Sequence, residues 1–118
     1  LKENKLNEID DYLFTSLNAL ETIDLNRNLI KTLNRNSFHG LEMCLKNLIL
    51  NENKLQFIKI YYFQNLIRLK SLQLKKNFIS SIETGSFNTI INLEELNLED
   101  NCIFALDFRL FFNLNKLK

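Results

Sequence analysis

Apolar residues alternate with polar ones in four short segments that are spread evenly along the chain. A period of two places successive side chains on opposite faces of an extended chain, so each segment predicts a β-strand with one buried face. Beyond these segments the apolar spacing changes, which indicates that the chain leaves each strand and returns along another path. The alternation is carried by Ile23 and Leu25, Leu48 and Leu50, Leu72 and Leu74, and Leu96 and Leu98.

The four segments belong to one repeating unit. An asparagine recurs as Asn4, Asn28, Asn53, Asn77 and Asn101, at spacings of 24, 25, 24 and 24 residues. A phenylalanine recurs at another phase of the unit, as Phe14, Phe38, Phe63, Phe87 and Phe111. One turn of such a chain cannot bury its own apolar face. We therefore expect the turns to stack into one continuous core, with parallel strands about 4.8 Å apart.

The combined pattern is L-x-x-L-x-L-x-x-N-x-[LI]-x-x-[LI]-x-x-x-x-F-x-x-L, and it resembles the 24-residue typical class of the leucine-rich repeat family over essentially the whole chain. The resemblance implies an α/β fold, a right-handed solenoid shaped like a horseshoe. Its concave side would be a parallel β-sheet, and its convex side would consist of loops and short helical turns. Residues 1–118 would form a single array without caps, an internal fragment with a partial repeat 1–19, full repeats 20–44, 45–68, 69–92 and 93–116, and a next repeat that begins at 117.

One unit is a residue longer than the others, because four steps separate Leu41 from Leu45 where three separate Leu66 from Leu69. We expect the extra residue to bulge at the entrance to the strand. This unit resembles the 25-residue units of chaoptin-like and related insect cell-surface adhesion proteins, and the chain as a whole resembles a fragment of a chaoptin-like or Toll-like animal ectodomain.

Asparagine is expected to have two structural roles in this chain. The sequence has no proline and two glycines, Gly40 and Gly85, so tight turns must be made by other residues, and asparagine tolerates such geometry. Its amide also offers donors and an acceptor to backbone groups that the sheet leaves unpaired. We therefore predict a structural asparagine ladder of Asn4, Asn28, Asn53, Asn77 and Asn101.

The polar positions between the buried strand residues should face outward from the concave sheet. A rigid scaffold that holds varied side chains at regular spacing suits the binding of a partner, since little conformational entropy is lost. The predicted partner-binding residues are Asp24, Asn26, Asn47, Ile49, Asn51, Ser71, Gln73, Lys75, Glu95, Asn97 and Glu99.

Charge changes sign between two neighbouring predicted strands. Lys70, Lys75 and Lys76 make one strand region basic, and Glu94, Glu95, Glu99 and Asp100 make the next one acidic. The step could steer a partner with complementary charges. Alternatively, the adjacent rows neutralise each other across the sheet.

A second surface feature is aromatic. Phe104, Phe108 and Phe112 lie four residues apart, a spacing that forms one stripe on a helix. They could pack against each other or against a following repeat. They could also make a lateral contact with a partner or with a second copy of the chain.

The remaining composition excludes several classes of function. The formal net charge is +1, which predicts no general attraction to nucleic acid or to an anionic membrane. The chain has no catalytic triad, glycine-rich phosphate loop or metal-ligand spacing, and its one histidine, His39, is expected to face solvent. We expect neither an enzyme, nor a cofactor, nor a metal, nor a small-molecule substrate.

The two cysteines are not expected to pair with each other. Cys44 and Cys102 lie two turns apart, roughly 10 Å, whereas a disulfide needs Cα atoms within about 7 Å. Both should be free thiols, or Cys44 pairs with a residue outside these 118 residues.

These features predict a non-catalytic protein-binding scaffold. The resemblance favours an extracellular or cell-surface receptor or adhesion protein, with a protein ligand or co-receptor and with any membrane attachment outside this segment. An intracellular scaffold or regulatory subunit in the cytoplasm is the alternative. The free cysteines and the absence of Asn-x-Ser/Thr sites favour this alternative slightly.

Overall fold

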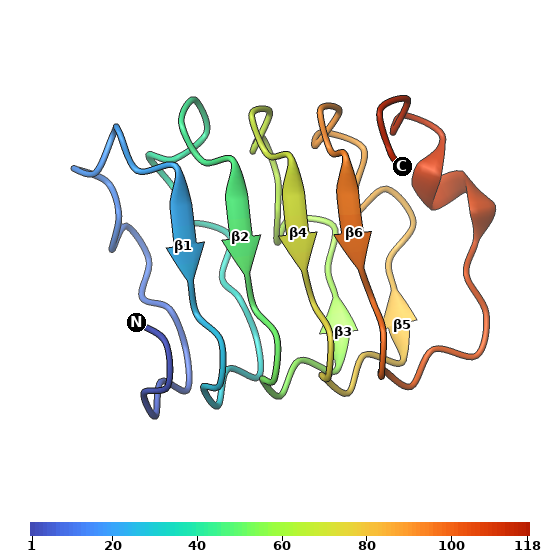
Figure 1. The fold of residues 1–118 in the computed structure, drawn as a ribbon, viewed down its shortest axis with the longest axis horizontal. Coiled ribbons are helices and arrows are strands. Elements are labelled where there is room, and N and C mark those ends of the chain that lie inside the picture. Colours follow the sequence, from blue (N-terminus) through green and yellow to red (C-terminus); the bar gives the residue numbers. More distant parts are fainter.

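The computed structural model describes all of residues 1–118 and shows a coil of stacked turns. Each turn contributes one strand to a four-stranded parallel sheet in the order β1-β2-β4-β6 (Figure 1). The strands are β1 (Thr22–Asp24), β2 (Asn47–Ile49), β4 (Ser71–Gln73) and β6 (Glu95–Asn97). Each strand lies at the alternating segment that predicted it. The predicted parallel-sheet solenoid is therefore confirmed.

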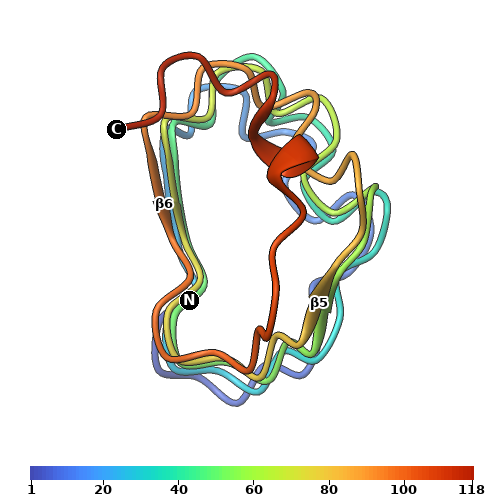
Figure 2. The same ribbon diagram turned by 90° about the vertical axis from the view of Figure 1, so that its right-hand side faces the viewer.

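The register of the sheet follows from the repeat. Ile23 pairs with Leu48, Leu48 with Leu72, and Leu72 with Leu96, so equivalent residues of successive turns lie side by side. Ile23, Leu48 and Leu72 are buried, and the residues on either side of them face outward. Viewed along the coil, the turns superpose except for the last returning segment, drawn in red, which runs closer to the sheet; the sheet lies on one side and the returning segments on the other (Figure 2). Shared register is what joins the apolar residues of each turn into one core.

The side opposite this sheet differs in part from the prediction. Loops and short helical turns were expected there, and one 3₁₀ helix, η1 (Phe108–Phe111), is present. Two turns instead form a second parallel sheet from β3 (Phe57–Ile58) and β5 (Ser81–Ile82). Ile58 and Ile82 lie in register, and Ile58 is buried in the core.

The recurring phenylalanines form an aromatic column inside the returning segments. Ring centroids lie 6.4 Å apart for Phe14 and Phe38, 6.5 Å for Phe63 and Phe87, and 6.4 Å for Phe87 and Phe111. No ring contact joins Phe38 to Phe63, the pair that spans the longer unit. The column is therefore interrupted where the repeat length changes.

The extra residue of the longer unit lies just before β2. The carbonyl oxygen of Leu41 accepts hydrogen bonds from the N–H groups of both Cys44 and Leu45, at 3.1 and 3.0 Å. In the next turn the carbonyl oxygen of Leu66 accepts a single such bond, from Leu69. The added residue thus widens one turn at the strand entrance and leaves the sheet register unchanged.

Candidate functional site

The strand ends are fixed by buried asparagine side chains. The Nδ2 group of Asn53 donates to the carbonyl oxygens of Leu50 in its own turn and Leu25 in the preceding turn, at 3.0 and 2.9 Å. Its Oδ1 accepts a 3.1 Å bond from the N–H of Ile30, also in the preceding turn. One amide therefore satisfies backbone groups of two turns at once.

The same arrangement recurs along the coil. Asn28, Asn77 and Asn101 each donate to the carbonyl three residues before them and to its equivalent one turn earlier. Each also accepts from a backbone N–H of the earlier turn. Asn4 departs from this pattern: it is exposed, and its amide contacts only the carbonyl oxygen of Lys2, at 3.4 Å. Residues 1–3 are too few to form an earlier turn that Asn4 could bridge.

A tight turn is made in each unit by the residue that precedes the recurring asparagine. These residues have positive φ angles between 56° and 58°, and they are Glu3, Arg27, Glu52, Lys76 and Asp100. The expectation that asparagine itself supplies the tight turns is wrong here, and Asn65 is the single asparagine with a positive φ. A charged side chain can occupy this position because it points into solvent, while the next residue must carry the buried amide.

The candidate site is the outward side of the four-stranded sheet, called the strand face below. It consists of the outward-facing side chains in and just after the strands, which form three rows that run across the turns. All of them are exposed or partly exposed. The rows are Thr22, Asn47, Ser71 and Glu95; Asp24, Ile49, Gln73 and Asn97; and Asn26, Asn51, Lys75 and Glu99.

Two asparagines of the third row serve the scaffold. The Oδ1 of Asn26 accepts a 2.9 Å bond from the N–H of Asn51. The Oδ1 of Asn51 in turn accepts a 2.7 Å bond from the N–H of Lys75. These amides add side-chain contacts to the pairing between turns, and each oxygen thereby uses one of its two acceptor positions.

The charge step between adjacent strands is compensated within the chain. Lys75 lies 2.8 Å from Glu99, and Lys70 lies 3.2 Å from Glu94. The hydrogen bond to Glu99 raises the pKa of Lys75, and the hydrogen bond from Lys70 lowers the pKa of Glu94. The basic strand region and the acidic strand region beside it therefore neutralise each other, as the alternative interpretation of the sequence predicted. Exposed pairs of this kind add little stability.

The middle row has a different character. Ile49 is the one apolar side chain of the strand face, and it is only partly buried. Its neighbours in the row are Asp24 and Gln73, which are paired with it in the sheet register. An accessible apolar residue in a polar surround resembles the centre of a protein interface, where apolar contact is enclosed by a polar rim.

Comparison with known proteins agrees with this geometry. The leucine rich repeat model matches residues 1–43, 44–101 and 67–118, so the matches span the whole chain. The chain belongs to the leucine-rich repeat family. No curated protein matches the sequence.

Solved structures of leucine-rich repeat proteins resemble the chain closely. One is the Toll–Spatzle complex of Drosophila, with 28% identity, a TM-score of 0.79, and coverage of 83% of this chain and 13% of that one. Another is the TLR13–ssRNA13 complex, with 30% identity, a TM-score of 0.73, and coverage of 97% of this chain and 19% of that one. The chain thus spans less than a fifth of either neighbour.

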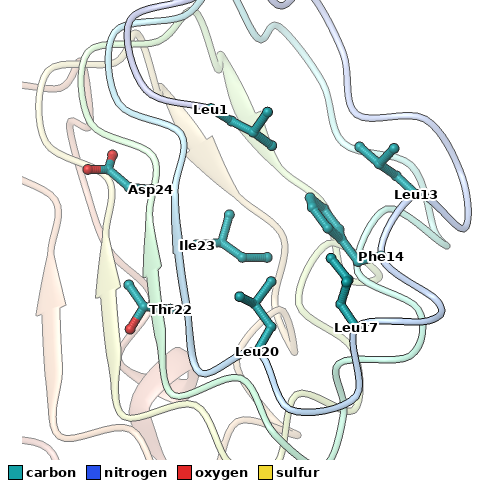
Figure 3. Close-up of a pocket in the computed structure, with 8 residues that line it drawn as sticks. All are labelled: Leu1, Leu13, Phe14, Leu17, Leu20, Thr22, Ile23 and Asp24. Carbon is teal, nitrogen blue, oxygen red and sulfur yellow. The ribbon is translucent and has the colours of Figure 1, made fainter.

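The leucine-rich repeat array also has an apolar hollow of about 420 Å³ at the end of the coil that holds the first turn. Figure 3 shows Ile23, Leu20 and Phe14 pointing into it, while Thr22 and Asp24 point to the other side of the strand. The equivalents of Leu17 and Leu20 in the next turn, Leu41 and Leu45, are buried. The hollow is therefore an open end of the core columns.

The aromatic stripe predicted in the last full repeat is exposed. Phe104, Phe108 and Phe112 are 100%, 71% and 62% accessible. Phe108 and Phe112 touch edge to face at 5.4 Å, so part of the predicted mutual packing is present. In the other repeats these positions hold mostly polar residues, such as Lys31, Arg35 and His39.

The other candidate groups are isolated. His39 is exposed beside Glu42, with Nδ1 and Oε1 3.3 Å apart. Cys44 and Cys102 are free thiols. No three His, Cys, Asp or Glu side chains gather as metal ligands, and none of the helices could cross a membrane.

Proposed function

We propose that this chain is a protein-binding segment of an extracellular or cell-surface leucine-rich repeat protein, and that the strand face binds the ligand. The central observation is Ile49, a partly exposed apolar side chain at a position that is polar in every other turn. The Toll neighbour supports a protein ligand, since that structure is a complex with Spatzle. The family is one of binding scaffolds, and no residue constellation here supports catalysis.

The rigidity of the strand face supports the proposal. Its backbone is held by the inter-strand hydrogen bonds, by the asparagine ladder, and by Asn26 and Asn51. No buried side-chain polar atom lacks a partner. A surface that is ordered before binding loses little entropy when the ligand arrives.

The TLR13 neighbour raises a different ligand class, because that structure is a complex with a single-stranded RNA. The strand face of this chain offers no aromatic side chain for base stacking, and Lys75 is paired with Glu99. We therefore propose that the strand face takes a protein and no nucleic acid.

The test uses a displayed library of extracellular protein fragments from the same genome, together with a fluorescent single-stranded RNA oligonucleotide. The chain and its Ile49→Lys and Lys75→Glu variants would be the baits. The matched control is Ile60→Lys, which places the same charge at an exposed isoleucine on the opposite side. We expect protein ligands whose binding is lost with Ile49→Lys and Lys75→Glu and retained with Ile60→Lys.

Ligands that respond equally to all three variants would contradict the assignment to the strand face. Binding of the RNA with an affinity similar to that of the proteins would contradict the ligand class. Location is tested separately, by antibody staining of an epitope-tagged parent protein on intact cells. Staining that appears only after permeabilisation would contradict an extracellular strand face.

A further inference from the structure

A polar hollow of about 190 Å³ lies beside the four-stranded sheet, at the edge where the chain enters the strands. It is separate from the strand face and contains no hydrophobic side chain. Four of its six lining residues are cationic and one is anionic. The lining residues are Lys46, Arg68, Lys70, Asn92, Glu94 and Lys116, called the entry flank below.

The coil itself sets the spacing of these charges. The N–H of Lys70 donates to the carbonyl of Lys46, and the N–H of Glu94 donates to the carbonyl of Lys70, both at 2.8 Å. These residues therefore occupy one column, with steps of about 4.8 Å between turns. The column continues to Lys118, whose N–H donates to the carbonyl of Glu94 at 3.0 Å.

Part of this positive charge is compensated. Lys46 lies 2.7 Å from Glu21, and Lys70 lies 3.2 Å from Glu94. Lys118 shares Glu94 at 3.6 Å. Because Lys70 lowers the pKa of Glu94, this carboxylate stays ionised and remains paired with Lys70 and Lys118.

Two cations of the entry flank have no acidic partner. Arg68 makes no ion pair, and the Nζ of Lys116 donates to the neutral amide oxygen of Asn92 at 2.6 Å. The six lining residues carry a formal charge of +3, whereas the whole chain carries +1. All other residues together therefore sum to −2, and positive charge is concentrated here.

The fold does not require these two charges. Arg68 and Lys116 occupy the position that holds Ala19, Cys44 and Asn92 in the other turns. Three uncharged residues support the same backbone there. Charge at this position is therefore available for binding an anion.

We propose that the entry flank binds a sulfated polysaccharide, with Arg68 and Lys116 contacting its sulfate esters. A guanidinium pairs with a tetrahedral oxyanion through two parallel hydrogen bonds, and an ammonium acts as a point charge beside it. Cations repeated along the coil axis match the repeated charges of a linear polyanion. Nucleic acid fits less well, because the hollow has no aromatic or apolar side chain on which a base could stack. The inference depends on the extracellular location proposed above.

The test measures binding of the 118-residue chain to a fluorescent heparin octasaccharide over a range of NaCl concentrations. Desulfated octasaccharide and a single-stranded RNA oligonucleotide are the competing probes. The test variant is Arg68→Asn with Lys116→Asn, which introduces the residue found at Asn92. The matched control is Lys31→Gln with Lys59→Asn, which removes two exposed cations elsewhere and introduces the residues found at Gln56 and Asn34.

We expect the test variant to raise the Kd for heparin about tenfold and to lower the slope of log K against log salt by about two, since two ionic contacts are lost. The control should change the Kd less than about twofold. Desulfated octasaccharide and RNA should bind at least about tenfold more weakly than heparin.

Equal losses in the test variant and the control would overturn the proposal, because attraction would then reflect overall charge. Equal or tighter binding of RNA would overturn the polysaccharide assignment. Neither result bears on Ile49, so failure here can be distinguished from failure of the protein-binding proposal.

Discussion

The side-chain Oδ1 of Asn51 accepts a hydrogen bond of 2.7 Å from the backbone N–H of Lys75 in the next turn. The contact lies past the end of β2, beside the backbone bond in which the N–H of Glu52 donates to the carbonyl of Lys75 at 2.9 Å, so it supplements the pairing between the two turns. A side chain that faces solvent on the strand face is therefore also part of the framework that holds the strand face flat.

Replacing Asn51 with alanine should lower the free energy of unfolding by about 1 kcal/mol, because the N–H of Lys75 loses its protein partner. The matched control is Asn47→Ala, since Asn47 donates only to the exposed hydroxyl of Thr22. Urea unfolding followed by circular dichroism would measure both. A control that loses as much stability as Asn51→Ala would contradict the structural part assigned to Asn51.

Asn77→Leu should destabilise the chain by at least about 2 kcal/mol. It leaves the buried N–H of Leu55 without a partner and removes one of the two amide donors from the carbonyls of Leu50 and Leu74. Asn4→Leu introduces the same residue at the exposed, unbridged end of the ladder and should change stability by less than about 0.5 kcal/mol. Equal thermal midpoints for Asn77→Leu and the parent chain would refute the ladder.

Lys76→Val should cost about 1–2 kcal/mol, because Lys76 has a φ of 56°, a region that β-branched residues avoid. Lys76→Asn should be tolerated, since asparagine adopts this conformation readily. Lys76 makes no ion pair, so the comparison isolates the backbone effect. Chemical denaturation of the two variants would show it, and similar losses in both would count against backbone strain as the cause.

The strands and their register could be predicted from the sequence because both depend on spacing alone. Ile23, Leu48, Leu72 and Leu96 occur at one phase of the unit, and equal phase means adjacent positions in a stacked coil. The strand pairing of Ile58 with Ile82 could not be predicted, since only two residues take part and no alternation marks them.

The candidate site was less accessible to sequence reasoning. The pattern placed Asn26 and Asn51 on the outward side of the sheet. Residue type alone cannot distinguish an amide that is free to bind a partner protein from one that is hydrogen-bonded to the next turn. The entry flank was missed because Arg68 and Lys116 are far apart in sequence and no apolar pattern marks their position. Aligning the charged residues by repeat phase would have revealed their shared column.

Asp107 and Arg109 give a prediction that depends on pH. Their 2.6 Å ion pair, with the hydrogen bond from Arg109 as the largest cause, lowers the pKa of Asp107 from 3.8 to about 2. A lowered folded-state pKa means that the contribution to stability is present above about pH 4 and is lost as the pH falls toward 2. The contribution should be small, because the pair is exposed.

An NMR titration of the Asp107 carboxyl carbon should therefore show a midpoint near 2, and Arg109→Gln should return the midpoint toward 3.8. The matched control is Arg35→Gln, which removes a guanidinium that contacts Gln64 instead of an acid. A midpoint that is the same in all three proteins would contradict the assigned cause.

The buried asparagines give every turn the same pair of contact surfaces. Each turn offers its predecessor one amide donor and one acceptor, and it offers its successor the carbonyl and N–H that the next asparagine needs. A gene segment that encodes one whole unit can therefore be duplicated or deleted without creating a mismatched junction. Such arrays can change length by unequal crossing-over while the asparagine contacts at each joint stay the same, and the outward residues are then free to diverge one unit at a time.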